Sequence, residues 1–179
     1  MGDLLVKTYG SAVFGIDAIT ITIEVNISTG VAFHLVGLPD NAVKESQPRI
    51  NAALRNNGFK YPSKKIVINM APADIRKEGS AYDLPLAVGI LAASEQVNAA
   101  QLDDYVIMGE LSLDGSLQPI KGALPIAIKA REEGFKGFIL PKQNAREAAV
   151  VNNLEVYGVS NIREVADFLT ASSRSSRPL

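Results

Sequence analysis

The sequence predicts one α+β domain in which helices pack on a mixed β-sheet. Its first part alternates apolar and polar residues, most clearly over residues 16–28, as strands with one buried face do. Its later part alternates short apolar segments with helix-like segments, several of which end at glycine. The chain has 179 residues, 47% of them hydrophobic, and a chain of this size can bury a core without disulfides. We therefore expect one domain over residues 1–170 and a linker stub or disordered tail over residues 171–179.

The first part of the chain is expected to begin with strands. Residues 4–15 indicate one strand and residues 16–28 the next. The turn at residues 28–30 leads into a third strand near residues 31–38, which predicts a hairpin with the second strand.

A helix is expected after these strands. Asp40 is a suitable N-cap, and Gly58 a suitable end. Pro48 lies inside this segment, so the helix kinks or begins anew there. Residues 65–72 then indicate a short strand, and residues 83–94 a helix so apolar that several of its faces must be buried.

The second half continues as alternating strands and helices. Residues 105–120 predict two short strands joined at Asp114–Gly115, a strong hairpin signal. The remaining elements follow in order: helix 122–134, strand 135–141, helix 143–151, strand 154–160, and helix 161–171 with Asn161 as its N-cap.

The composition excludes several kinds of site. The chain has no cysteine, so neither disulfides nor thiolate metal sites can form. His34 is the only histidine, and we expect it to be a half-buried structural residue rather than a metal ligand. The phosphate-loop pattern is absent, so no cofactor is expected in this chain. No signal peptide or membrane-length apolar stretch is present, which predicts a cytoplasmic protein without a membrane partner.

The charges are distributed unevenly, although the net charge is only -1. The segment from Ser46 to Ala73 carries no acidic residue, whereas the segment from Glu78 to Ile120 carries no basic one. Either these segments form ordinary solvated faces, or they are complementary poles for head-to-tail assembly. A third alternative is nucleic-acid binding by the basic segment, with Phe59 and Tyr61 as stacking or core residues. The candidate nucleic-acid-binding residues are Arg49, Arg55, Lys60, Tyr61, Lys64 and Lys65.

Four motifs carry a family resemblance. "GELSLDGSLQPIKG" at residues 109–122 and "LPKQN" at residues 140–144 resemble the C-terminal half of the Lon protease domain. "GLPDNAVKES" at residues 37–46 and "APADIRKEGSAYDLP" at residues 71–85 resemble the N-terminal domain of magnesium-chelatase-like AAA+ ATPases of the YifB/ComM type. The chain thus resembles the Lon-protease-like domain of that group over about residues 4–170.

The resemblance implies a fold and a context. The fold is the Lon-protease type, which the second domain of a small-subunit ribosomal protein shares. The domain normally precedes an ATPase module, which binds ATP and magnesium and forms rings. Members of the group are linked to DNA processing and competence. The expected partners are therefore the protein's own ATPase module, ring neighbours and DNA.

The resemblance also locates the positions of a catalytic dyad. Lon-type peptidases use a serine two residues after a glycine, and a lysine four residues after the glycine of a P-I-x-G element. Counting from Gly79 gives Ala81, and counting from Gly122 gives Ile126. Alanine has no nucleophile and isoleucine accepts no proton, so we expect this chain not to be an enzyme.

Ser80 keeps an alternative open. With a shift of one residue it becomes the nucleophile, and Lys121 or Lys129 becomes its base. The competing interpretation is structural, because Ser80 and Asp83 have the spacing of a capping box. Three functions remain as hypotheses: a non-catalytic accessory domain, a cryptic Ser/Lys peptidase, and a protein-interaction adaptor.

Overall fold

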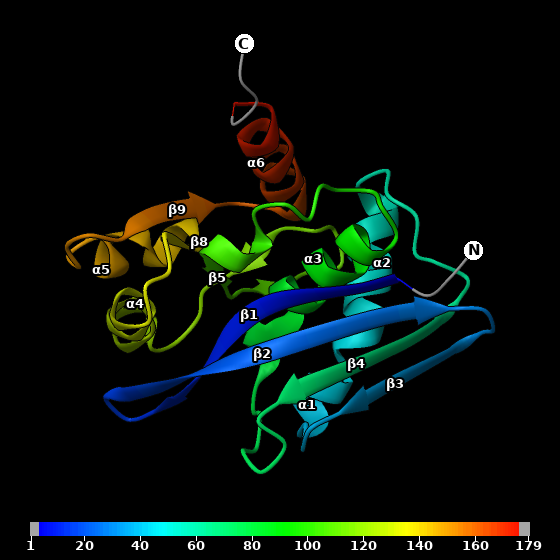
Figure 1. The fold of residues 1–179 in the computed structure, drawn as a ribbon, viewed down its shortest axis with the longest axis horizontal. Coiled ribbons are helices and arrows are strands. Elements are labelled where there is room, and N and C mark those ends of the chain that lie inside the picture. Colours follow the sequence, from blue (N-terminus) through cyan, green and yellow to red (C-terminus); the bar gives the residue numbers. More distant parts are fainter. Residues whose placement is uncertain (1–3, 176–179) are drawn as a thin grey trace.

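The computed structural model describes the backbone of residues 4–175 and the side chains of residues 4–171. Its main feature is a seven-stranded mixed sheet with the strand order β3-β4-β2-β1-β5-β8-β9 (Figure 1). The strands of this sheet are β1 (Leu4–Phe14), β2 (Asp17–Ser28), β3 (Ala32–Val36), β4 (Lys65–Ala71), β5 (Tyr105–Ile107), β8 (Gly137–Pro141) and β9 (Glu155–Val159). A separate two-stranded sheet pairs β6 (Glu110–Leu111) with β7 (Leu117–Gln118).

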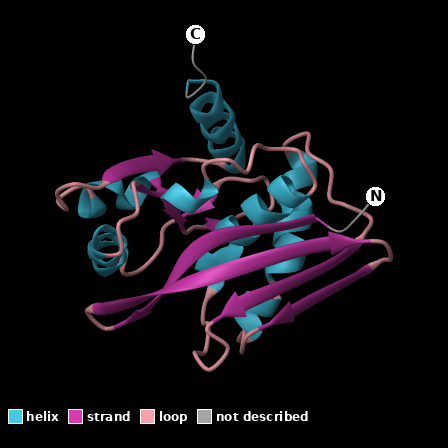
Figure 2. Ribbon diagram, in the orientation of Figure 1, coloured by secondary structure: helices cyan, strands magenta, loops and turns pink. Residues whose placement is uncertain are grey.

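Helices connect and cover these strands (Figure 2). The α-helices are α1 (Asn41–Lys44), α2 (Ser46–Asn56), α3 (Asp83–Ala93), α4 (Ala123–Glu132), α5 (Ala145–Ala148) and α6 (Ile162–Ser175). Three short 3₁₀ helices add η1 (Ser80–Tyr82), η2 (Leu102–Asp104) and η3 (Lys142–Asn144). Helices α2 and α3 lie on one face of β1, β2, β4 and β3 (Figure 2), and α4 packs against the hairpin of β1 and β2. This arrangement confirms the expected α+β fold.

The alternation of β2 determines which face of the sheet is buried. Strands β1 and β2 form a long antiparallel ladder that runs from the pair Leu4 and Ile27 to the pair Phe14 and Asp17. Ile21, Ile23 and Val25 point to the helices and are fully buried, as the sequence predicts.

Helix α3 occupies the centre of the core. All its residues are buried, which confirms the expectation from its apolar sequence. Gly89 allows it to approach β2 closely, because a Cβ atom at Gly89 would lie 2.6 Å from Cγ2 of Val25.

The predicted capping residues are confirmed. Asp40 accepts a hydrogen bond from the amide of Val43 through Oδ1 at 2.8 Å and so caps α1. The helix breaks at Glu45, and Pro48 lies in the first turn of α2, where a proline is tolerated. Asn161 accepts a bond from the amide of Glu164 and caps α6.

The pairing of β3 corrects the expected hairpin. β3 does not pair with β2, its neighbour in sequence, but runs parallel to β4. β4 lies between them and pairs with β2 from Thr22 to Ser28. The physical reason is the helical connection through α1 and α2, which crosses over and returns the chain parallel to β3.

The C-terminal helix also differs from the expectation. α6 continues to Ser175, so the described part of the predicted tail, residues 171–175, is helical rather than a linker stub. Residues 176–179 lie outside the described residues. Within the described part of the chain, no helix is long and apolar enough to cross a membrane.

Candidate functional site

The turn from Gly79 to Asp83 starts the buried helix α3. Gly79 adopts a φ of 88°, which favours glycine, and its amide donates to Oδ2 of Asp40 at 3.1 Å. Residues Ser80–Tyr82 form η1, and α3 begins at the next residue. The expected helix start at this turn is therefore confirmed.

Ser80 is held by a carboxylate rather than by an amine. Its hydroxyl donates a hydrogen bond to Oε1 of Glu110, at the start of β6. The expected capping box is wrong, because the side chains of Ser80 and Asp83 both bind groups other than the helix amides.

The buried carboxylate of Asp83 forms an ion pair with Arg49, whose side chain is 21% exposed. The Arg49 guanidinium donates from Nε to Oδ2 at 2.7 Å and from Nη2 to Oδ1 at 2.9 Å. Oδ2 of Asp83 also accepts the amide of Leu111 at 3.0 Å. Burial raises the pKa of the Asp83 carboxyl from 3.8 to about 6, although Arg49 and the Leu111 amide oppose this shift. The ion pair links α2 to the start of α3, and the bond from the Leu111 amide links Asp83 to β6.

A pocket of about 470 Å³ opens beside Ser80. It lies where β1 and the segment after β5 approach the turn, and Ser11, Met108 and Glu110 contribute to its wall. Ala81, one of the two dyad positions, also lines it. Ile126, the other position, is 1% exposed in α4 and is not among the described residues that line the pocket. Neither position supplies a group that can attack a carbonyl or accept a proton.

The two lysines considered as bases lie in different places. Lys121 is exposed and lines the same pocket as Ser80. The Lys129 ammonium lies on α4, 3.9 Å from the carboxylate of Glu132. The Ser80 hydroxyl bonds to Glu110 instead of either amine. Carboxylates are in general poor bases for a serine hydroxyl, because the best catalytic bases have a pKa near the working pH.

The basic segment does not form one continuous binding surface. Arg49 is engaged with Asp83, as described above, and Arg55 donates to Oδ1 of Asn51 at 2.6 Å. Lys60, Lys64 and Lys65 are exposed. None of these three lysines has an ion pair within the described residues.

The two aromatic residues of the basic segment pack against the protein. Tyr61 is half-buried, and its hydroxyl accepts a bond from Nε2 of Gln47 at 3.3 Å. The centroid of the Phe59 ring lies 4.4 Å from the guanidinium carbon of Arg163. Of the two interpretations, the structure favours core packing over base stacking for both rings.

His34 is exposed rather than half-buried, because β3 lies at the edge of the sheet. Over residues 4–171, no group of three or more histidine, cysteine or carboxylate side chains is arranged to hold a metal ion.

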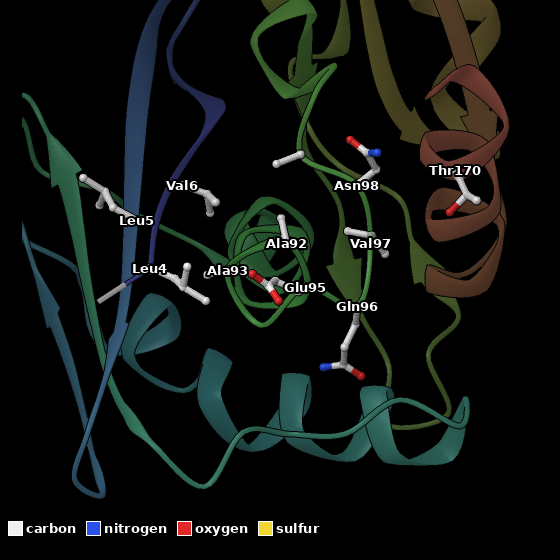
Figure 3. Close-up of a pocket in the computed structure, with 11 residues that line it drawn as sticks. Leu4, Leu5, Val6, Ala92, Ala93, Glu95, Gln96, Val97, Asn98 and Thr170 are labelled. Carbon is white, nitrogen blue, oxygen red and sulfur yellow. The ribbon is translucent and has the colours of Figure 1, made fainter. Parts of the chain in front are cut away.

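A second pocket, of about 560 Å³, lies at the other end of β1 (Figure 3). Leu4 and Val6 of β1, Ala92 at the end of α3 and Thr170 of α6 line it. Glu95 is the only charged residue among its described lining residues, and no predicted site residue lies there. This pocket is mainly apolar and pairs no nucleophile with a base.

Sequence reasoning missed two residues that help to build the site, Glu110 and Lys77, and the pairing of Arg49 with Asp83. Glu110 was part of a motif, but its contact with Ser80 spans 30 positions and leaves no local signal. Lys77 is fully buried, which its charged neighbours in sequence did not suggest. The partnership of Arg49 and Asp83 had a usable signal, since a lone carboxylate in an apolar helix requires a buried partner.

Comparisons with known proteins show which family the chain resembles. The family model described as subunit ChlI of Mg-chelatase matches residues 23–144. Competence protein ComM of Haemophilus influenzae is 43% identical over 171 residues, which cover 95% of this chain and 33% of that protein. Uncharacterized protein YifB of Escherichia coli is 43% identical over 93% of this chain and 33% of its own length. Lon protease 2 of Bacillus subtilis is 31% identical over 69% of this chain and 22% of its own length.

These similarities confirm the family resemblance and the Lon-like fold. The chain spans about a third of the length of the ComM and YifB relatives.

Proposed function

Because the chain belongs to the family of subunit ChlI of Mg-chelatase, we propose that it is a non-catalytic accessory domain of a ComM-type AAA+ ATPase. In this proposal the longer protein takes part in DNA processing or competence. The ATPase module, with its ATP and magnesium, belongs to the part of the protein outside this chain. This domain positions that module and contacts its neighbours in a ring.

One observation carries the non-catalytic role. The serine hydroxyl of the turn is bonded to the Glu110 carboxylate, while the two dyad positions hold Ala81 and Ile126. A Ser/Lys peptidase needs a serine whose proton passes to a buried, neutral lysine. Lys121, the lysine that lines the pocket, is exposed and so lacks the burial that such a base requires.

A peptidase assay tests this role. The chain is incubated with casein and with fluorogenic peptides, with and without ATP and magnesium. We expect no cleavage above buffer. Cleavage that persists in Ser63→Ala, an exposed serine away from the turn, but disappears in Ser80→Ala would show a cryptic peptidase and overturn the proposal.

A second candidate function is weak contact with DNA phosphates. It is favoured by the exposed ammonium groups of Lys60, Lys64 and Lys65, which no carboxylate within the described residues neutralises. Non-specific phosphate contacts of this kind give dissociation constants of about 10⁻⁴–10⁻⁶ M at physiological salt. Assembly of several copies in a ring would add contacts and raise the avidity.

Fluorescence anisotropy with single-stranded and branched DNA tests this contact. A triple variant of Lys60, Lys64 and Lys65 to alanine should weaken binding and reduce the slope of log K against log salt by about 0.9 for each phosphate that is no longer neutralised. The matched control replaces three exposed lysines elsewhere, Lys121, Lys136 and Lys142, with alanine. Equally weakened binding in both variants, or no binding at low salt, would leave a protein-interaction adaptor as the better account.

A further inference from the structure

Strand β3 forms one edge of the seven-stranded sheet and has only β4 as a neighbour (Figure 1). Ala32 donates its amide to the carbonyl of Lys64, on the β4 side. Because backbone groups alternate in direction along a strand, the amides and carbonyls of Phe33 and Leu35 point away from β4. The edge therefore offers a short row of hydrogen-bonding groups to another strand.

This edge lacks the features that usually prevent strands from pairing between molecules. Such features are charged side chains, prolines and bulges. No Asp, Glu, Lys or Arg occurs between Glu24 and Asp40, and the strand itself contains no proline. Large apolar side chains are also exposed on and beside it: Val31 is 85% exposed, Val36 49% and Leu38 54%.

The opposite edge of the sheet is protected. β9 begins with the exposed Glu155, whose carboxylate accepts the hydroxyl of Tyr157. A charged side chain on an edge strand opposes pairing with an identical strand, since the like charges would approach each other. The two edges therefore differ in the property that controls self-association.

We propose that β3 pairs with β3 of a second copy of this chain, antiparallel and about a two-fold axis at His34. In this register Phe33 and Leu35 of one copy exchange backbone hydrogen bonds with Leu35 and Phe33 of the other. His34 faces His34, and Ala32 faces Val36. The two sheets become one continuous sheet.

The occupant is a second copy because the edge is complementary to itself. A two-fold contact uses the same surface on both molecules, so any charge near the axis would face an identical charge and be repelled by it. Residues 25–39 contain no such charge apart from a protonated His34. In the proposed register Ala32, His34 and Val36 of one copy lie on the same face of the joined sheet as Val36, His34 and Ala32 of the other, which places apolar side chains on both sides of the axis.

A charge-exchange experiment tests the pairing and its axis. We expect the unchanged chain to dimerise in sedimentation velocity across a concentration series. His34→Lys and His34→Glu should each weaken dimerisation roughly fivefold or more, because like charges face each other across the axis. A mixture of the two variants should dimerise more tightly than either alone, with one copy of each in the dimer.

Some results would overturn the proposal. A chain that stays monomeric at every concentration would show that the edge has another occupant, such as a segment of the longer protein. A dimer that both single variants leave unchanged would place the contact elsewhere. His34 is exposed, and circular dichroism of each variant verifies that the fold is retained.

A crosslinking experiment gives an independent answer. The chain has no cysteine, so His34→Cys introduces a single thiol, which should form a disulfide-linked dimer under mild oxidation. Glu155→Cys, on the opposite edge strand, is the matched control and should crosslink much less. Equal crosslinking of the two variants would contradict the proposed register.

Discussion

Two buried charges flank the turn that holds Ser80, and they are stabilised in different ways. Asp83, on the helix side, has an opposite charge as its partner, the guanidinium of Arg49. Lys77, on the other side, is fully buried, and its ammonium donates to the backbone carbonyls of Gly37 and Pro72. Burial lowers the pKa of the Lys77 ammonium.

The difference shows how the shape of the turn is maintained. The backbone carbonyl of Lys77 also accepts the amide of Asp40 at 2.9 Å, and the Asp40 carboxylate in turn accepts the amide of Gly79. Asp83 connects the other end of the turn to α2 and β6. The two charged residues therefore connect the two ends of the turn to neighbouring elements, whereas the Ser80 hydroxyl bonds to Glu110. In the proposed account the scaffold is kept while the peptidase chemistry is absent.

The largest effect is expected when the ion pair is broken on one side. Arg49→Met leaves the buried Asp83 carboxylate without its counter-charge, and removing one partner of a buried pair costs about 3–5 kcal/mol. Urea unfolding followed by circular dichroism measures this loss. The double variant Arg49→Met, Asp83→Leu is the control and should lose less, since no unpaired charge remains. A double variant less stable than Arg49→Met would contradict the role given to the unpaired charge.

A smaller loss is expected at Lys77. Lys77→Met keeps the apolar stem but removes the donor to two carbonyls, and buried groups left without a partner cost about 1–3 kcal/mol. No opposite charge is left unpaired, so the loss should be less than in Arg49→Met. The exposed Lys44→Met is the matched control, with an expected change within about 0.5 kcal/mol. If Lys77→Met cost more than Arg49→Met, the contrast between the two charges would be reversed.

The pH dependence of stability sharpens the contrast further. The pKa of Asp83 in the folded chain, about 6, lies above its ordinary value of 3.8. The folded chain therefore binds the proton of the Asp83 carboxyl more tightly than the unfolded chain does. Protonation of Asp83 adds stability as the pH falls through about 6, and this stability is lost as the pH rises again. Relative to Asp83→Asn, the free energy of unfolding should increase by on the order of 1 kcal/mol between about pH 7 and pH 5. A decrease over the same window would show that Arg49 outweighs burial.

The smallest effect is expected at Ser80. Its bond to Glu110 is partly exposed, so Ser80→Ala should cost about 1 kcal/mol or less. Thermal unfolding measures the change. A loss as large as that in Lys77→Met would give the serine a scaffold role comparable to that of the buried charges.

Local signals in the sequence predicted much of this fold. The alternation in β2, the N-caps Asp40 and Asn161, and the apolar helix α3 depend on neighbouring residues and appear where they were expected. The pairing of β3 was not predicted correctly. The short turn after β2 favours a hairpin between β2 and β3, whereas the observed pairing of β3 with β4 depends on how α1 and α2 pack.

At the candidate site, too, local patterns were predicted and long-range contacts were not. The family motifs located the turn and its helix, and counting along the chain placed Ala81 and Ile126 at the dyad positions. The partners of the turn are distant in sequence: Arg49 lies 34 positions from Asp83, and Gly37 lies 40 positions from Lys77. Such contacts are set by the tertiary fold, and only the need of a buried charge for a partner hints at them.

The central claim is that Ser80 is an ordinary serine held by Glu110 and is not activated by a lysine. Reaction with a fluorophosphonate probe tests it directly, because such probes modify activated serines. We predict that mass spectrometry of the unchanged chain will find no adduct at Ser80 above the level of exposed serines such as Ser63. An adduct at Ser80 that disappears in Lys121→Ala or Lys129→Ala would contradict the claim and identify the base.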